Sequence, residues 1–156
     1  MQLIAKSGLS QFGVSWDNLP TAAEFDEFHR ELRNTLCKSA DELWGSPNHG
    51  FGHGVAAKLI NVYFKAMYLS GVELSGAPAK WRAKANALHP PIDRLLLAEL
   101  ALKDVGGKRL FWKKKMLVGW SNFTPKDYEC TIDVIRNVTD GALWKIEMHW
   151  LGAAET

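Results

Sequence analysis

The chain has little of what marks several specialised classes of protein. Its 156 residues include two cysteines, Cys37 and Cys130, which are too few for a disulfide framework and lack the spacing of a metal-cluster motif. The longest apolar stretches fall far short of the roughly 20 residues that span a bilayer, and Met1 to Lys6 has no signal-peptide pattern. These absences predict a cytoplasmic protein that does not cross a membrane.

The sequence also shows no alternation of apolar and polar residues long enough for a β-strand, and it contains no internal repeat. With 47% hydrophobic and 23% charged residues, it has the composition of an ordinary globular protein. We therefore expect residues 1–156 to form one compact, multi-helix, all-α domain that acts as a monomer and needs no cofactor.

Helix start signals divide the chain into elements. Thr21 and Glu24 have the spacing of a capping box and precede apolar residues at helical intervals, and Ser39 and Glu42 repeat that signal. Turn-forming residues predict a break at 45–50, and a loop is expected at 70–79. Further helices are predicted at 55–69, 80–88, 94–103, from Thr124 onward and at 142–151.

Charge is distributed unevenly, although the net charge is only +2. Residues 51–126 carry 13 basic and 4 acidic side chains, a net charge of +9, whereas both flanking segments are acidic. A basic surface of this kind predicts a polyanion partner, here a nucleic acid. The densest basic run, at 108–115, has a solvated loop or helix face as its alternative. Its cations are Lys108, Arg109, Lys113, Lys114 and Lys115.

One carboxylate is carried on an unusually stiff segment, Pro90-Pro91-Ile92-Asp93, directly before an apolar helical run. Proline fixes its own φ angle and pushes the preceding residue into an extended conformation, so this segment has few conformations to choose from. Asp93 can therefore be aimed at a ligand, or it can cap the following helix. The two roles are compatible.

A glycine-rich segment, Asn48 to Gly54, precedes the helix predicted at 55–69. Glycines allow a ligand to approach the backbone closely, and N–H groups at a helix start bind anions such as phosphate. The alternative is a tight hairpin between two helices. His49 and His53 lie four residues apart, but the glycines between them and the lack of an intervening glutamate argue against a metal site.

Together these features resemble the helix-hairpin-helix DNA glycosylases, and most closely their 8-oxoguanine glycosylase-like branch. The resemblance covers roughly Gly50 to Leu100 and includes the run Pro-Pro-Ile-Asp-Arg-Leu-Leu-Leu. It implies a helix-hairpin-helix followed by a proline-rich loop and a catalytic aspartate, Asp93. It also makes Lys58 the counterpart of the lysine nucleophile of bifunctional members. The hairpin residues implied to grip the DNA backbone are Gly50, Gly52, His53 and Gly54.

The resemblance implies an enzyme that hydrolyses the N-glycosidic bond of a damaged or modified base after the base has left the DNA stack. The carboxylate of Asp93 would stabilise the oxocarbenium ion or activate water. Relatives suggest an oxidised purine as the base. Whether lyase chemistry follows, and whether the setting is base-excision repair or defence against phage DNA, stays open. The side chains expected to line the base pocket are Trp44, His49, Phe51 and Trp120.

Two other functions fit the sequence. Arg82 and His89 have the Arg-x(4–6)-His spacing of HEPN-type ribonucleases. Alternatively, the chain is a non-catalytic helical module that binds DNA or a protein partner, with Asp93 serving only as a helix cap. The three functions differ in what they predict: base release that needs Asp93, RNA cleavage that needs Arg82 and His89, or binding alone.

Overall fold

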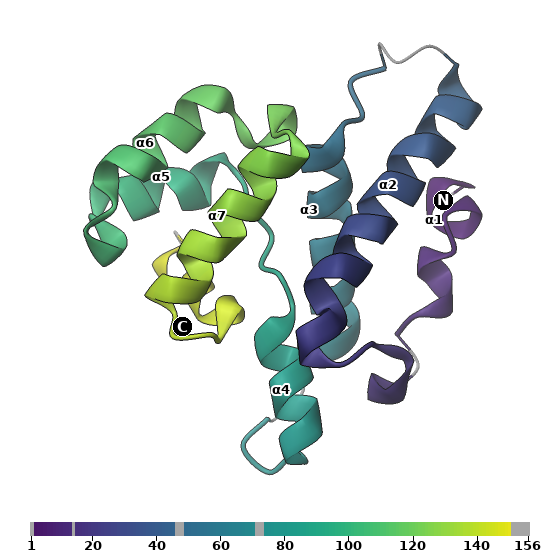
Figure 1. Ribbon diagram of the computed structural model, residues 1–156, viewed down its shortest axis with the longest axis horizontal. Helices are drawn as coiled ribbons and strands as arrows, with labels where there is room; N and C mark the ends of the chain where they lie inside the picture. Colours follow the sequence, from purple (N-terminus) through teal and green to yellow (C-terminus); the bar gives the residue numbers. More distant parts are fainter. Residues whose placement is uncertain (1, 14, 46–48, 71–73, 151–156) are drawn as a thin grey trace.

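The computed structural model describes residues 2–13, 15–45, 49–70 and 74–150. Across these residues the chain folds into helices without a β-strand (Figure 1), so the all-α prediction is confirmed. None of the described helices is long and apolar enough to cross a membrane. The α-helices are α1 (Gln2–Lys6), α2 (Phe25–Trp44), α3 (His53–Phe64), α4 (Ala79–Ala87), α5 (Arg94–Leu102), α6 (Arg109–Val118) and α7 (Pro125–Val138).

Shorter helical turns connect and extend these helices. The segment η4 (Lys65–Leu69) continues α3 as a π-helix. The 3-10 helices are η1 (Leu9–Gln11), η2 (Trp16–Asn18), η3 (Ala22–Glu24), η5 (Val105–Gly107), η6 (Trp120–Asn122) and η7 (Leu143–His149). The helices predicted at 55–69, 80–88 and 94–103 are thus confirmed, and Thr124 caps α7 as predicted. Residues 46–48, 71–73 and 151 of the predicted break, loop and last helix lie outside the described residues.

The longest helix, α2, begins after the predicted capping box. The Thr21 N–H and hydroxyl both donate to the Glu24 carboxylate, at 3.2 and 2.6 Å. The second start signal, at Ser39 and Glu42, is wrong, because both residues lie inside α2. Ala40 is fully buried, so the apolar face of α2 continues past Ser39 without interruption.

The basic run at 108–115 lies mostly within a helix, α6. Trp112 accounts for this, because its ring is fully buried and its indole N–H donates to the Val105 carbonyl at 2.9 Å. Most of the run therefore lies in a packed helix and not in a loop, with Lys113 and Lys114 on its exposed side.

The C-terminal element expected as an α-helix at 142–151 is the 3-10 helix η7. Leu143 and Ile146 are both buried and lie three residues apart. A helix with three residues per turn places such a pair on one side. Packing of these two side chains against the core therefore agrees with the tighter form.

The apolar core consists of two clusters on either side of α3. One cluster is formed mainly by α1, α2 and α3 and includes Ile60 and Leu88. The other is formed mainly by α5, α6, α7 and η7 and includes Ala57 and Ile92. The segment 88–93, which links α4 to α5, therefore has one apolar side chain in each cluster. Figure 1 shows this segment running between α3 and α7.

Candidate functional site

The structure brings together the two residues that the glycosylase resemblance makes catalytic. Lys58 lies on α3 and Asp93 directly precedes α5, and the Lys58 Nζ donates to the Asp93 Oδ2 at 3.2 Å. The other carboxylate oxygen, Oδ1, accepts the Leu96 N–H at 2.9 Å, so Asp93 also caps α5. The Lys58 side chain is 30% exposed and that of Asp93 only 12%, so the lysine reaches solvent while the carboxylate is mostly covered.

Trp120 lies against this pair. The Lys58 Nζ is 4.6 Å from the centre of a Trp120 ring, a cation–π distance. The start of α3 packs on the same turn, since a Cβ on Gly54 would lie 1.9 Å from the Trp120 carbonyl oxygen. Gly54 is therefore needed for close packing of α3 on η6. A cavity of about 200 Å³ adjoins η6, with Arg94 and Met116 among its lining residues.

A set of hydrogen-bonded side chains, here called the polar seam, joins α2, α3, α7 and the segment 88–93. Its members are Asp26, His29, Asn61, His89, Tyr128 and Arg136. The Asn61 amide nitrogen donates to the Pro90 carbonyl and to the Tyr128 hydroxyl, both at 2.9 Å. The polar seam thus holds the backbone of the segment that carries Asp93.

Hydrogen-bonding chemistry fixes the orientation of the Asn61 amide. The Pro90 carbonyl can only accept, so the amide nitrogen must face it. The amide oxygen then faces His29, whose Nε2 lies 2.8 Å away and must carry the donated hydrogen. His29 therefore carries a hydrogen on Nε2.

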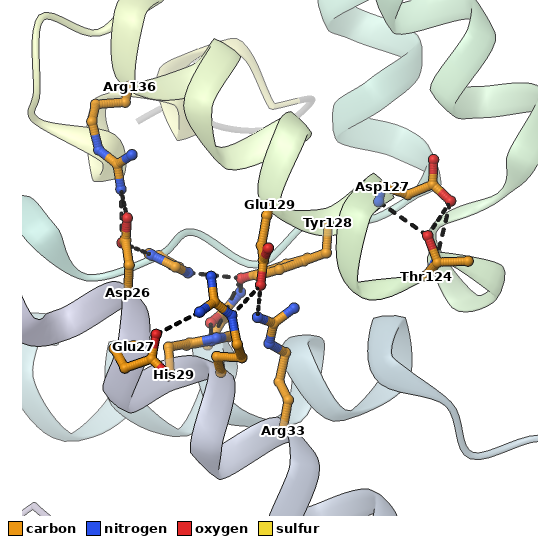
Figure 2. Close-up of polar contacts among 12 residues, drawn as sticks. Asp26, Glu27, His29, Arg33, Thr124, Asp127, Tyr128, Glu129 and Arg136 are labelled. Carbon is orange, nitrogen blue, oxygen red and sulfur yellow. Dashed lines mark hydrogen bonds and ion pairs between the residues drawn. The ribbon is translucent and has the colours of Figure 1, made fainter.

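His89 continues the polar seam toward the surface. Its Nε2 donates to the Asp26 carboxylate, and its Nδ1 accepts from the Tyr128 hydroxyl, each at 3.0 Å. Figure 2 shows Arg136 directed at Asp26, where one guanidinium nitrogen lies 2.7 Å from each carboxylate oxygen. The ionised ends of the seam thus lie toward solvent, while its imidazoles are buried.

Burial lowers the pKa of both histidines. The pKa of His29 lies well below its ordinary value because of burial, and the nearby His89 and Arg33 add to this effect. Burial also lowers the pKa of His89, although Asp26 partly offsets it. The hydrogen bond from His89 is the main cause that lowers the pKa of Asp26 to about 2. At neutral pH the polar seam therefore combines neutral imidazoles with an ionised carboxylate.

Arg33 extends the buried polar group between α2 and α7. Its side chain is 1% exposed, and it donates to the Glu129 Oε1 at 2.9 Å. Its guanidinium carbon lies 4.5 Å from the centre of the Tyr128 ring (Figure 2). Arg30 donates to the same Glu129 oxygen at 2.7 Å and is the largest cause that lowers the pKa of Glu129. These contacts fasten α7 onto α2.

The predicted base-pocket residues fall in two places. Trp44 forms edge-to-face contacts with His49 and Phe51, with ring centres 5.5 and 5.8 Å apart. His49 also contacts the Asp41 carboxylate at 2.7 Å. This aromatic group lies where α2 ends and α3 is about to begin, whereas Trp120 lies against Lys58.

The hairpin residues predicted to bind DNA have different surroundings. Gly50 is exposed and has a φ of +75°, a left-handed conformation that favours glycine. Gly52 precedes α3, and His53 is its first residue. Gly54 is buried against η6, so its Cα faces protein and not an open surface.

Four of the five predicted basic contacts are exposed. They are Lys108, Arg109, Lys113 and Lys114. Lys115 is only 7% exposed and donates to the Asp127 carboxylate at 2.8 Å. The bond from Lys115 is the largest cause that lowers the pKa of Asp127 to about 2. The Thr124 hydroxyl, shown beside Asp127 in Figure 2, also donates to this carboxylate and lowers its pKa further. Lys115 therefore joins α6 to α7 internally.

Arg82 and His89, the pair of the ribonuclease alternative, have separate surroundings. Arg82 is exposed on α4, and its guanidinium contacts the Ser75 carbonyl at 3.5 Å. His89 is 6% exposed, and both its ring nitrogens already have partners in the polar seam. This arrangement gives no support to acid–base chemistry on RNA by these two residues.

Asn61 and Tyr128 were not expected at the site. The sequence signal for Asn61 is a single amide within the apolar run Leu-Ile-Asn-Val, because a buried amide needs hydrogen-bond partners.

Among the described residues no group of three or more His, Cys, Asp or Glu side chains is placed to hold a metal ion. Comparison with known proteins found no family model, no curated protein and no solved structure that matches the chain.

Proposed function

We propose that the chain is a DNA N-glycosylase, which hydrolyses the N-glycosidic bond of a damaged or modified base flipped out of double-stranded DNA. The observation that carries the proposal is the contact between Lys58 and Asp93 at 3.2 Å. These are the two residues to which the glycosylase resemblance assigns the chemistry, and they lie 35 positions apart in the chain.

The geometry of Asp93 suits a role at the sugar. In hydrolysis the bond between C1′ and the base nitrogen breaks, its electron pair leaves with the base, and positive charge develops on the sugar. A water molecule then bonds to C1′ and gives up a proton. Oδ1 is bonded to the Leu96 N–H, so Oδ2, which also accepts from Lys58, is the oxygen that would stabilise that charge or accept the proton.

Lys58 is compatible with two versions of the reaction. As an ammonium group it balances the Asp93 carboxylate and attracts a DNA phosphate. As a neutral amine it would attack C1′ itself and form a covalent bond with the sugar, which leads to strand cleavage. The two versions differ in a measurable way, since only the second attaches the protein to the DNA during the reaction.

Exposed cations support DNA as the substrate. Lys113 and Lys114 lie on the outer surface of α6, and Lys108 and Arg109 lie at its start. The backbone N–H groups of the first turn of α3, next to Gly52, can bind a phosphate as well. Such contacts neutralise backbone charge without reading the sequence, as an enzyme that surveys DNA for one altered base requires.

Release of free bases tests the proposal. The purified chain is incubated with oligonucleotides that carry oxidised or alkylated bases and with DNA from phages that contain modified bases, and mass spectrometry identifies each released base. Damaged substrates would indicate repair, and phage substrates defence. Asp93→Asn should lower the rate of release at least ~100-fold, while the fold is kept because asparagine also caps helices.

Asp104→Asn is the matched control. Asp104 also accepts a backbone N–H near a helix start, that of Arg109 at 2.9 Å, but it precedes α6 and does not contact Lys58. This variant should release the base at the wild-type rate. A wild-type protein that releases no base from any of these DNAs, or an Asp93→Asn variant that stays active, would contradict the proposal.

Borohydride reduction separates the two versions of the reaction. If Lys58 bonds to the sugar, reduction should trap the wild-type protein on DNA, and Lys58→Gln should abolish the trapped complex. Lys65→Gln, on η4, is the control and should be trapped like the wild type. If Lys58 only balances Asp93, the wild type should release the base without a trapped complex.

A non-catalytic DNA-binding module is the second candidate. The observation that favours it is the hydrogen bond from the Leu96 N–H to the Asp93 carboxylate. Capping of α5 is a sufficient reason for an aspartate at this position, without any catalytic role. In that case the wild type binds DNA without releasing a base, and Asp93→Asn binds DNA equally well.

A further inference from the structure

Asn61 connects the polar seam to the segment that carries Asp93. Its side chain is buried and makes three hydrogen bonds, two from the amide nitrogen and one to the amide oxygen. One of the two donated bonds goes to the Pro90 carbonyl. An ionised aspartate could not donate to that carbonyl, and a leucine could neither donate nor accept.

The Pro90 carbonyl lies in the middle of a segment whose ends are both anchored. Segment 88–93 has apolar side chains in both core clusters, and its last residue, Asp93, is bonded to α5 and to α3. Two consecutive prolines restrict rotation within the segment. Few of the intervening bonds can therefore absorb a displacement at Pro90 before it reaches Asp93.

One helix supplies both the group that holds Pro90 and the cation that faces Asp93. Asn61 follows Lys58 by three positions on α3, so a rigid helical turn sets the distance between the two side chains. The Asp93 carboxylate is thus fixed relative to Lys58 in two ways, directly through the ion pair and indirectly through Pro90.

We propose that Asn61 is a positioning residue for Asp93, which holds the carboxylate where it meets both Lys58 and the sugar of the substrate. The catalytic part of this inference rests on the proposed glycosylase function, whereas its geometric part does not. Without Asn61 the Pro90 carbonyl loses its donor, and the segment can move toward a different partner. In a preorganised site a displacement of about 1 Å lowers the rate about 100-fold.

Two variants separate positioning from general loosening of the polar seam. Asn61→Leu keeps a similar volume and removes all three hydrogen bonds. Tyr128→Phe also breaks the polar seam, because Asn61 and His89 lose a partner, but it leaves the bond to Pro90 intact. Single-turnover base release should fall ~100-fold in Asn61→Leu and less than ~5-fold in Tyr128→Phe, with the Kd for DNA changed less than about twofold in both.

The Leu96 amide reports the position of Asp93 without any reaction, because its N–H donates to the Asp93 Oδ1. In two-dimensional NMR spectra, Asn61→Leu should shift the Leu96 amide resonance and speed its hydrogen exchange at least about tenfold. Tyr128→Phe should leave both close to their wild-type values. If both variants only loosened the polar seam to the same extent, the Leu96 amide would change equally in both.

Two results would overturn the inference: equal losses of rate in both variants, or an unchanged Leu96 signal in Asn61→Leu. If the wild type releases no base from any DNA, the glycosylase proposal fails, and the Leu96 signal alone decides whether Asn61 positions Asp93. Should Asn61→Leu fail to fold, Asn61→Ser, whose shorter side chain cannot reach Pro90, is read by the same criteria.

Discussion

Asp93 uses its two carboxylate oxygens for different partners. Oδ1 accepts the Leu96 N–H and begins α5, while Oδ2 faces Lys58. A helix cap and a reactive carboxylate are usually alternative explanations of an aspartate that precedes a helix. Here one oxygen caps a helix and the other contacts a lysine, so residue types and spacing alone could not choose between the two explanations.

Gly54 is the second residue with a consequence of its own. Alanine normally stabilises a helix relative to glycine by roughly 0.5–1 kcal/mol, but a Cβ at this position would meet the Trp120 carbonyl oxygen at 1.9 Å. Gly54→Ala should therefore lower the free energy of unfolding by about 1–3 kcal/mol, as overpacking does. Urea denaturation followed by circular dichroism measures the change.

Gly76→Ala is the control for that substitution. Nothing lies within 4 Å of a Cβ placed on Gly76, so its free energy of unfolding should stay within about 0.5 kcal/mol of the wild type. If Gly54→Ala is as stable as the wild type, α3 does not pack against η6 as closely as this distance requires.

At the scale of elements, the lysines of α6 have two kinds of surroundings. Lys113 and Lys114 are exposed, whereas Lys115 is buried against Asp127. Replacing Lys113 and Lys114 together by glutamine should weaken DNA binding. It should also reduce the salt dependence of the binding constant by roughly one unit of slope for each phosphate that the variant no longer neutralises. Titrations of labelled duplex DNA at several salt concentrations measure both quantities.

Lys115→Gln should act differently. It should leave the salt dependence of DNA binding unchanged and lower the thermal stability, because the ionised Asp127 loses its buried partner. A salt dependence reduced as much as in the double variant would show that Lys115 reaches DNA.

The elements themselves could largely be predicted because their signals are local. The capping box at Thr21, the cap at Thr124 and the apolar spacing within α3 and α5 each depend on neighbours a few residues away. The errors arose where distant packing decides. The burial of Ala40 carries α2 through a false start signal, and the burial of Leu143 and Ile146 accompanies a 3-10 helix where an α-helix was expected.

At the scale of the whole molecule, the two apolar clusters meet at a seam of titratable side chains. The pKa of His29 and of His89 is lower in the folded than in the unfolded protein, so the unfolded state binds more protons as the pH falls below about 6.5. The stability that the neutral histidines contribute should be fully present above that pH. Below it, the free energy of unfolding should fall by up to about 1.4 kcal/mol per pH unit for each histidine. Chemical denaturation between pH 8 and pH 4 (roughly the histidine range) measures this.

Asp26 adds to the loss of stability at lower pH. Its pKa is about 2 in the folded protein and 3.8 as the ordinary value, so the stability that it contributes is present above about pH 4 and lost toward pH 2.

His29→Phe should flatten the pH dependence of the free energy of unfolding near pH 6, whereas Tyr128→Phe should retain that dependence. The groups that face the histidines are Arg33, Asn61, Tyr128, Asp26 and Arg136. Identical slopes in the wild type and His29→Phe would refute the assignment.

The candidate site was only partly accessible from the sequence. Asp93 and Lys58 stood out because a stiff segment and a family motif marked them. Asn61, His29 and Tyr128 carry no such mark, since their hydrogen bonds join α2, α3 and α7, and residue spacing cannot tell which helices meet. The polar seam therefore became visible only in three dimensions.

The placement of Gly54, Lys58 and Asn61 on one helix has a consequence for how this protein can diverge. Inserting or deleting a single residue between Lys58 and Asn61 would turn the asparagine by about 100° around the helix axis relative to the lysine. The two side chains could then no longer contact Asp93 and the Pro90 carbonyl together. Descendants of this chain should therefore keep the intervals of four and three residues that separate Gly54, Lys58 and Asn61 along α3.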